Sequence, residues 1–278
     1  MSVKEDLIRQ QIRESYSKVA EASNDGGGCG VESSCCGVSS DVDINTVVST
    51  RMGYSEEDIK STPQGADMGL GCGTPKAIAS IQRHETVLDL GSGGGFDCFL
   101  AAQELAGTGQ VIGVDMTPAM LSKARLNAEK TDYKNIQFRL GEIEHLPVAD
   151  LSVDVIISNC VINLSPNKSQ VFDEAFRVLK AGGRMAVSDV VASAPLPEAI
   201  KNDKELLSGC MAGASTIEEI KAMMEHSGFI NISIVPKDES RSFIKDWAPG
   251  TNIEEFVISA YIQADKPAAI SSADSCCA

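Results

Sequence analysis

The stretch Val87–Asp97, VLDLGSGGGFD, decides how this chain folds. A short apolar run typical of a buried strand leads into Gly91, Gly93 and Gly95, and a helical pattern follows over residues 96–107. Glycine lets a ligand approach the backbone closely, and the first turn of a helix presents free amide groups. The stretch therefore predicts a strand, a ligand-binding loop and a helix, which together open a nucleotide-binding α/β sheet.

Strand and helix patterns alternate through most of the chain. Alternation of this kind is typical of a doubly wound, mostly parallel sheet. We predict an α/β fold with a Rossmann-like core and a seven-stranded sheet. The expected strands cover 86–90, 110–114, 136–140, 153–158, 183–190, 230–235 and 255–262, and the expected helices cover 3–22, 96–107, 118–130, 168–180, 197–208 and 216–226.

Changes in composition divide the chain into four expected parts. A Gly/Ser/Cys tract, SNDGGGCGVESSCCGVSS, follows an amphipathic N-terminal helix that we expect to be exposed, and no regular element would tolerate such a tract. The parts are a flexible Cys-rich arm (1–45), a ligand-binding core (46–195), a helical insertion with the final strands (196–265) and a disordered Cys-containing tail (266–278).

The bulk composition excludes several classes of partner. The formal net charge is −15 and the isoelectric point is near 4.6, so nucleic acid and anionic membranes would be repelled. No apolar run approaches the roughly 18 residues of a membrane helix, and the charged beginning has no signal-peptide pattern. We expect a cytoplasmic protein. Its nine cysteines then indicate reduced thiols with metal-binding or redox roles, although any one of them could be an ordinary buried residue.

Two further motifs extend the glycine loop into a nucleoside pocket. The dinucleotide fingerprint would need its third glycine where Phe96 stands, which weakens a nicotinamide reading. Asp115 closes the second strand, where it can hydrogen-bond ribose hydroxyls, and GEIEHLP follows the third strand at the adenine end. The ordered set resembles class I methyltransferases that bind S-adenosylmethionine. The expected cofactor-binding residues are Asp89, Gly91, Ser92, Gly93, Gly95, Asp115, Met116, Glu142, Ile143 and Asn159.

A cysteine occupies the place where such enzymes usually hold a base. Cys160 follows the fourth strand in VIISNCVINLS, whereas enzymes that methylate oxygen or nitrogen need a group there to take a proton. His84, His145 and His226 all lie outside this loop. The sequence therefore offers no obvious general base.

Two more cysteines stand where the fold could bring them to Cys160. Cys72 lies in GLGCGTP before the core, and Cys210 lies in LLSGCMAGA after the fifth strand. Their separations exclude a local zinc knuckle, so a common site must be assembled by the fold at the carboxyl edge of the sheet. Three converging thiols suit a soft, thiophilic acceptor. Cys98, inside the helix after the glycine loop, is expected to be core.

With these residues in view, the resemblance becomes specific. LGCGTP, VLDLGSGGGFD, GEIEHLP, ISNCVINLS, FRVLKAGGRMAVSDV and GCMAGA look like the arsenite S-adenosylmethionine methyltransferases over about residues 45–235. The resemblance implies that trivalent arsenic, free or as a thiol conjugate, is the substrate. It implies that Cys72, Cys160 and Cys210 bind the arsenic as a trithiolate, that methylation is stepwise, and that no permanent metal is needed.

The resemblance also implies a redox role for the arm. Methylation formally oxidises arsenic, so two electrons must return, which a cysteine pair can supply by forming a disulfide. Cys29, Cys35 and Cys36 are the candidates, and vicinal Cys35 and Cys36 are a poor pair because their disulfide would be strained. We prefer Cys36 with Cys72, and expect an external thiol such as thioredoxin or glutathione to reduce the disulfide.

Two alternatives remain open at this point. A quinone- or sterol-type C- or O-methyltransferase shares the glycine loop but gives the three cysteines no joint role. A thiol-based metalloid or zinc binding protein would retain S-adenosylmethionine only as a structural ligand. The tail pair Cys276 and Cys277 could capture or deliver metalloid, or could be inert.

Overall fold

The computed structural model describes residues 2–22, 44–201 and 203–269. The cysteines of the arm and of the tail, and the predictions made for them, lie outside the described residues. These cysteines are Cys29, Cys35, Cys36, Cys276 and Cys277.

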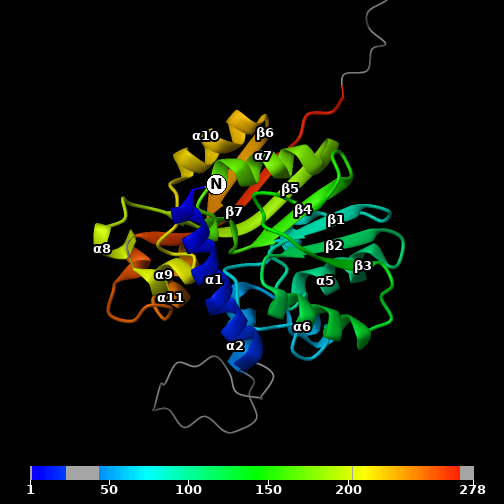
Figure 1. The fold of residues 1–278 in the computed structure, drawn as a ribbon, viewed down its shortest axis with the longest axis horizontal. Helices are drawn as coiled ribbons and strands as arrows, with labels where there is room; N and C mark the ends of the chain where they lie inside the picture. Colours follow the sequence, from blue (N-terminus) through cyan, green and yellow to red (C-terminus); the bar gives the residue numbers. More distant parts are fainter. Residues whose placement is uncertain (1, 23–43, 202, 270–278) are drawn as a thin grey trace, which may run out of the picture.

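One sheet of seven strands organises the molecule (Figure 1). Six strands point in one direction, and β7 runs antiparallel to both of its neighbours, β5 and β6. The predicted α/β class and the mostly parallel, seven-stranded sheet are confirmed. In order across the sheet the strands are β3 (Ile136–Leu140), β2 (Gln110–Asp115), β1 (Thr86–Leu90), β4 (Val153–Asn159), β5 (Leu179–Ala192), β7 (Val257–Asp265) and β6 (Ile230–Pro236).

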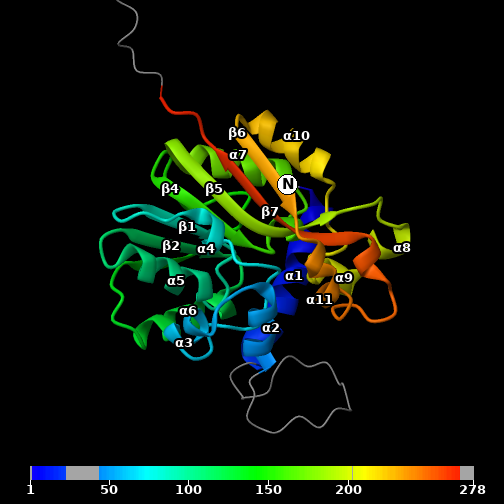
Figure 2. The ribbon, with the colours of Figure 1, turned by 180° about the vertical axis from the view of Figure 1, so that it is seen from behind.

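Helices cover both faces of the sheet. The alternation of side chains along β1 divides the core. Leu88 and Leu90 pack with α7 (Lys168–Val178) and α10 (Ile217–Ser227), whereas Val87 packs with α4 (Lys76–Ala79) and α5 (Phe96–Leu105) on the other face (Figures 1 and 2). The α-helices are α1 (Val3–Ala22), α2 (Ile44–Met52), α3 (Glu56–Ser61), α4 (Lys76–Ala79), α5 (Phe96–Leu105), α6 (Pro118–Glu129), α7 (Lys168–Val178), α8 (Glu198–Lys201), α9 (Lys204–Ser208), α10 (Ile217–Ser227) and α11 (Arg241–Ile244). The short 3-10 helices are η1 (Ile162–Leu164), η2 (Asp238–Ser240) and η3 (Ile253–Glu255).

The strand order creates a switch point between β1 and β4. The chain moves from β1 outward to β2 and β3, and then returns to the other side of β1 with β4. Leu90 and Ser158 are register partners at the carboxyl ends of these two strands. The glycine loop after β1 and Cys160 after β4 therefore leave the sheet side by side, where open α/β sheets hold their ligands.

The N-terminal helix differs from its prediction in one important respect. α1 forms over the expected residues, but it is not exposed along its length, because Arg9, Ile12 and Ala20 are buried. It contacts α6 and α9 and lies between them across the front of the molecule (Figure 1). The helix thus forms part of the wall above the switch point.

Two smaller differences concern the second half of the chain. The predicted helical stretch 197–208 contains two short helices, α8 and α9. β5 extends beyond the predicted 183–190 at both ends, because Leu179 pairs with Val153 of β4 and the pairing with β7 continues to Ala192. Among the described residues, no helix combines the length and apolar character that crossing a bilayer would require.

Candidate active site

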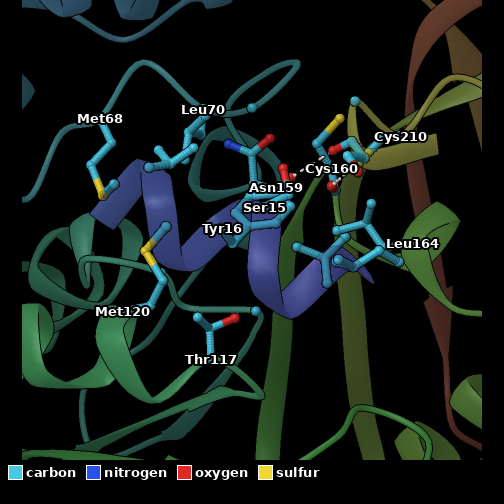
Figure 3. Close-up of a pocket in the computed structure, with 18 of the residues that line it drawn as sticks. Ser15, Tyr16, Met68, Leu70, Thr117, Met120, Asn159, Cys160, Leu164 and Cys210 are labelled. Atoms are coloured by element: carbon cyan, nitrogen blue, oxygen red, sulfur yellow. Dashed lines mark hydrogen bonds between the residues drawn. The ribbon is translucent and has the colours of Figure 1, made fainter. Parts of the chain in front are cut away.

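A cavity of about 730 Å³ opens at the switch point. Its size falls in the range of small-molecule and cofactor sites. The glycine loop, the loop before α4, the residues after β4 and one side of α1 form its walls (Figure 3). The segment around Cys210 and the stretch from Trp247 to Thr251 complete it.

Glycine is required in the loop after β1 by geometry. Gly91 has a φ of +70°, and a Cβ there would lie 2.5 Å from Cγ2 of Val161. A Cβ on Gly93 would meet nothing within 4 Å. The backbone amides of Gly93 and Thr117 donate to the two carboxylate oxygens of Asp115, at 2.9 and 2.8 Å. These two bonds hold Asp115 at the cavity wall. Burial raises the pKa of its carboxyl group.

Ser92 provides the test of whether a nucleoside ligand fits this loop. Ser92 is one of the residues that line the cavity, and its buried hydroxyl has no hydrogen-bond partner among the described residues. An unpaired buried hydroxyl is costly, so it indicates a ligand with a polar group at this position. The loop, the carboxylate of Asp115 and the free hydroxyl together fit the ribose and the methionine portion of S-adenosylmethionine.

Most of the expected cofactor-binding residues line this cavity, but two do not. Gly95 ends the loop with a φ of +91°, and a Cβ there would lie 2.9 Å from the rings of Phe99 and Phe138. Glu142 forms ion pairs with Arg9 and Arg13 of α1. The expected residues that line the cavity are Asp89, Gly91, Ser92, Gly93, Asp115, Met116, Ile143 and Asn159.

Two carboxyl groups lie close together below the loop. Asp89 accepts a hydrogen bond from the Cys98 thiol at 3.2 Å, and Asp97 accepts one from the Tyr54 hydroxyl at 2.7 Å. Burial raises the pKa of Asp97 to about 6, and burial together with the charge of Asp97 raises the pKa of Asp89. Cys98 is buried in the core as predicted, and it also donates to a cavity carboxyl. A cationic ligand would favour the ionised form of either carboxyl.

The structure brings Cys72, Cys160 and Cys210 together, although they are far apart in sequence. The sulfurs of Cys72 and Cys160 and one carboxylate oxygen of Asp189 lie within 4.8 Å of one another. The Cys210 thiol donates to the carbonyl oxygen of Cys160 (Figure 3). Cys160 and Cys210 line the cavity, whereas Cys72 is fully buried and reaches it through its contact with Cys160.

Two of these cysteines have an unusual backbone conformation. Cys160 has a φ of 58° and Cys210 a φ of 65°, in the left-handed region that side-chain-bearing residues seldom adopt. Cys160 comes directly after β4 and its amide donates to the carbonyl of Ser188 at 2.8 Å. Strained conformations of this kind cluster at functional sites because the surroundings must enforce them.

The three thiols are held in their neutral form. Burial raises the pKa of Cys72 well above its ordinary value. The hydrogen bond with Cys210, followed by burial, raises the pKa of Cys160 well above its ordinary value. For Cys210 the hydrogen bond with Cys160 lowers the pKa, but burial and the nearby charge of Asp189 outweigh it, so the pKa is raised.

Asn159 holds the loop that carries Cys72. Its Oδ1 accepts from the Cys72 amide at 3.0 Å, and its Nδ2 donates to the Gly73 carbonyl at 2.8 Å and to the Tyr54 hydroxyl at 2.9 Å. A Cβ on Gly71 would lie 2.8 Å from Nδ2 of Asn159, which explains the glycine. Asn159 thus joins the cysteine loop to the residues beside Asp97.

Three residues at the site were missed by the sequence reasoning. Asp189 is buried, accepts from the Ile162 amide at 2.9 Å and from Nδ2 of Asn163 at 2.8 Å, and has its pKa raised to about 6 by burial. Its position near the end of a buried strand was a usable signal. Tyr16 and Trp247 gave no such signal, because each lies in a segment whose packing over the cavity depends on the whole fold.

Comparison with known proteins agrees with this geometry. A family profile described as a methyltransferase domain matches residues 81–228. An arsenite methyltransferase of Halobacterium salinarum is 53% identical over 272 residues, which cover 94% of this chain and 67% of that protein. The human arsenite methyltransferase is 41% identical over 168 residues, covering 57% of this chain and 44% of that protein.

A solved structure provides a further likeness. The crystal structure of an arsenic(III) S-adenosylmethionine methyltransferase from Chlamydomonas reinhardtii superposes with a TM-score of 0.58 at 32% identity, covering 80% of this chain and 73% of that chain. This chain spans between about half and two thirds of the length of most curated relatives it matches. On the profile, the sequence identity and the shared fold, the chain belongs to the arsenite methyltransferase family of class I S-adenosylmethionine-dependent methyltransferases.

Proposed function

We propose that this protein transfers methyl groups from S-adenosylmethionine to trivalent arsenic held by the thiolates of Cys72, Cys160 and Cys210. The observation that carries the proposal is the contact among three buried thiols beside a cavity that also contains the glycine loop. No such cluster is needed for methyl transfer to oxygen, nitrogen or carbon.

The neutral state of the thiols supports arsenite as the substrate. Arsenite at neutral pH is the uncharged As(OH)₃, and its three hydroxyls exchange with three protein thiols to give an uncharged As(SR)₃ and three water molecules. No net proton leaves the site. Zinc would instead require deprotonated thiols and would release protons on binding.

Arsenic as the acceptor requires no general base. None of the described residues that line the cavity is a histidine, although several carboxyl groups do line it. The lone pair of trivalent arsenic carries no proton, so a general base has no proton to remove at methyl transfer. A thiolate set that fixes the arsenic can contribute about 7–11 kcal/mol through orientation alone when the geometry is near ideal.

The residues around the glycine loop would hold the methyl donor. Asp115 suits the ribose hydroxyls, Ser92 offers a free hydroxyl, and Asp89 and Asp97 suit positive charge. S-adenosylmethionine, when bound, supplies an electrophilic methyl group.

Cysteine oxidation would return arsenic to the trivalent state. Methyl transfer leaves the arsenic formally pentavalent. The thiolate of Cys36 attacks the sulfur of Cys72, a Cys36–Cys72 disulfide forms, and the electron pair of the As–S bond returns to arsenic. The methylated arsenic is then trivalent and keeps the bonds to Cys160 and Cys210. An external dithiol or glutathione-type thiol reduces the disulfide.

Cys72 must become accessible for this chemistry. It is fully buried, and its loop is held by Asn159 through the amide of Cys72 and the carbonyl of Gly73. We therefore expect arsenite to exchange first with Cys160 and Cys210, which line the cavity, and then with Cys72.

Product analysis with cysteine variants tests the proposal. The protein is incubated with arsenite, S-adenosylmethionine and a dithiol, and the arsenic species are separated. The wild-type protein should form methylarsenicals, and Cys72→Ser, Cys160→Ser and Cys210→Ser should each lose activity by about 100-fold or more.

Cys98→Ser is the matched control, because Cys98 is equally buried and serine keeps the hydrogen bond to Asp89. It should retain most of the activity. Full activity in any two of the three site variants, or no methylarsenical from the wild-type protein, would contradict the proposal.

A further inference from the structure

The N-terminal helix α1 contributes polar groups to both ends of the cavity. Tyr16 donates to the carbonyl of Ser208 at 3.2 Å, and its hydroxyl lies beside the Cys210 thiol. Figure 3 shows α1 as the blue ribbon crossing the cavity, with Ser15 and Tyr16 among the side chains that line it. The proposed mechanism gives no role to Arg9, which this helix contributes to the cavity away from Cys210.

Arg9 is buried and only partly satisfied. Its side chain is 4% exposed, and its Nε and Nη2 atoms donate to Oε1 of Glu144 at 3.2 and 3.1 Å. Nε also lies 3.4 Å from Oε2 of Glu142. The remaining nitrogen, Nη1, is buried and has no hydrogen-bond partner within the described part of the chain, although Arg9 lines the cavity. A buried charged donor left unpaired is costly, so the position of Nη1 indicates a ligand acceptor.

The surroundings decide which kind of acceptor fits. The carboxylates of Glu142 and Glu144 both pair with the guanidinium of Arg9. Glu142 also forms an ion pair with Arg13 at 3.6 Å. An anionic ligand group would gain little from a cation that is already neutralised. Arg9 and Glu144 line the cavity together with Ile143, which follows the third strand at the adenosine end. An uncharged acceptor of a nucleoside therefore fits Nη1 best.

We infer that Arg9 binds the methyl donor directly, with Nη1 donating a hydrogen bond to an uncharged acceptor of the adenosine half, either an adenine ring nitrogen or a ribose hydroxyl. The inference rests on the proposed function and adds a cofactor-binding residue from outside the core of the sheet. α1 then holds the adenosine half through Arg9 and contacts the Cys210 thiol through Tyr16.

Binding of S-adenosylhomocysteine, measured by calorimetry on the full chain, tests the assignment. Arg9→Met should weaken binding about 10- to 100-fold, because a hydrogen bond from a charged donor is lost. Arg13→Met is the matched control, since Arg13 lies on the same helix and pairs with Glu142 but does not line the cavity. It should change the affinity by less than about twofold.

A folding defect is separated from the loss of a ligand contact by a second variant and by ligand analogues. Arg9→Met leaves Glu144 buried without its cation, whereas Arg9→Met combined with Glu144→Gln removes both charges and keeps the bond to Ser165. Analogues lacking adenine N1, adenine N3, the 2′-hydroxyl or the 3′-hydroxyl are compared. On the wild-type protein, one analogue should bind about tenfold more weakly than S-adenosylhomocysteine. On the double variant, the same analogue and S-adenosylhomocysteine should bind equally well.

Three results would overturn the assignment. The first is equal affinity of Arg9→Met and the wild-type protein for S-adenosylhomocysteine. The second is the same loss of affinity for each analogue in the wild-type protein and the double variant. Either result would remove Arg9 from the cofactor site while leaving the proposed function intact. Failure of the wild-type protein to bind S-adenosylhomocysteine at all would contradict both.

Discussion

At the scale of single residues, the site combines three neutral thiols with donors that hold their loops. Cys160 and Cys210 have left-handed backbone conformations, and the loop of Cys72 is held by Asn159. Tyr16 adds a hydroxyl beside Cys210. These contacts fix the sulfurs before a ligand arrives, so less conformational freedom has to be lost on binding.

Tyr16→Phe tests the contact between α1 and Cys210. Removing the hydroxyl should weaken arsenite binding about 3- to 10-fold, which is the usual value of one hydrogen bond, and should leave the affinity for S-adenosylhomocysteine unchanged. Trp247 is the single tryptophan of the chain and lines the cavity, so its fluorescence can report both titrations. Tyr133→Phe, which removes a hydroxyl away from the cavity, should change neither, and an equal effect of both variants would contradict the assignment.

Asp97 should make binding of the methyl donor depend on pH. Burial raises the pKa of Asp97 to about 6, so the carboxyl is ionised above that pH and protonated below it. S-adenosylmethionine carries a positive ammonium and sulfonium, and it favours the ionised form. Binding should therefore be full near about pH 7 and weaken about tenfold by about pH 5.

Calorimetry across this range with Asp97→Asn checks the assignment. The variant cannot ionise, so it should bind more weakly near about pH 7 and show a flatter profile below it. A profile of the variant as steep as that of the wild-type protein would assign the dependence to another group.

At the scale of elements, the sequence predicted the sheet well and the N-terminal helix poorly. The central strands β1 and β4 carry buried, largely apolar runs, and the chain order of strands and helices leaves few topologies open. The convergence of Cys72 and Cys160 follows from that topology. The buried face of α1 includes Arg9, which looks exposed in sequence and is paired with Glu144, 135 residues away. No local pattern encodes such a pair.

Ile12→Ala tests whether α1 docks on the cavity in solution. Ile12 is fully buried against the segment that carries Cys210, so truncation should cost about 2–5 kcal/mol of docking free energy. Amide hydrogen exchange should become faster in α1 and stay unchanged in β1. Leu7→Ala, on the exposed side of the same helix, is the control and should leave both rates unchanged. Unchanged exchange in Ile12→Ala would contradict the docking.

At the scale of the whole molecule, the net charge should affect the association rates of the two substrates differently. The chain carries a formal charge of −15, which attracts a cation at long range and has no Coulomb effect on uncharged arsenite. Raising the salt from about 50 to about 500 mM should slow association of S-adenosylmethionine severalfold and change arsenite association less than about twofold. Stopped-flow fluorescence of Trp247 measures both. Equal salt dependence for the two ligands would indicate that arsenic enters as a charged species.

The central claim is that three cysteine sulfurs bind the arsenic, and X-ray absorption at the arsenic edge tests it most directly. The wild-type protein loaded with one equivalent of arsenite should have three sulfur neighbours around arsenic and no oxygen. Cys98→Ser should give the same result, and serine at position 72, 160 or 210 should each leave two sulfurs. Three sulfurs persisting in any of these three variants, or an oxygen shell in the wild-type protein, would contradict the account.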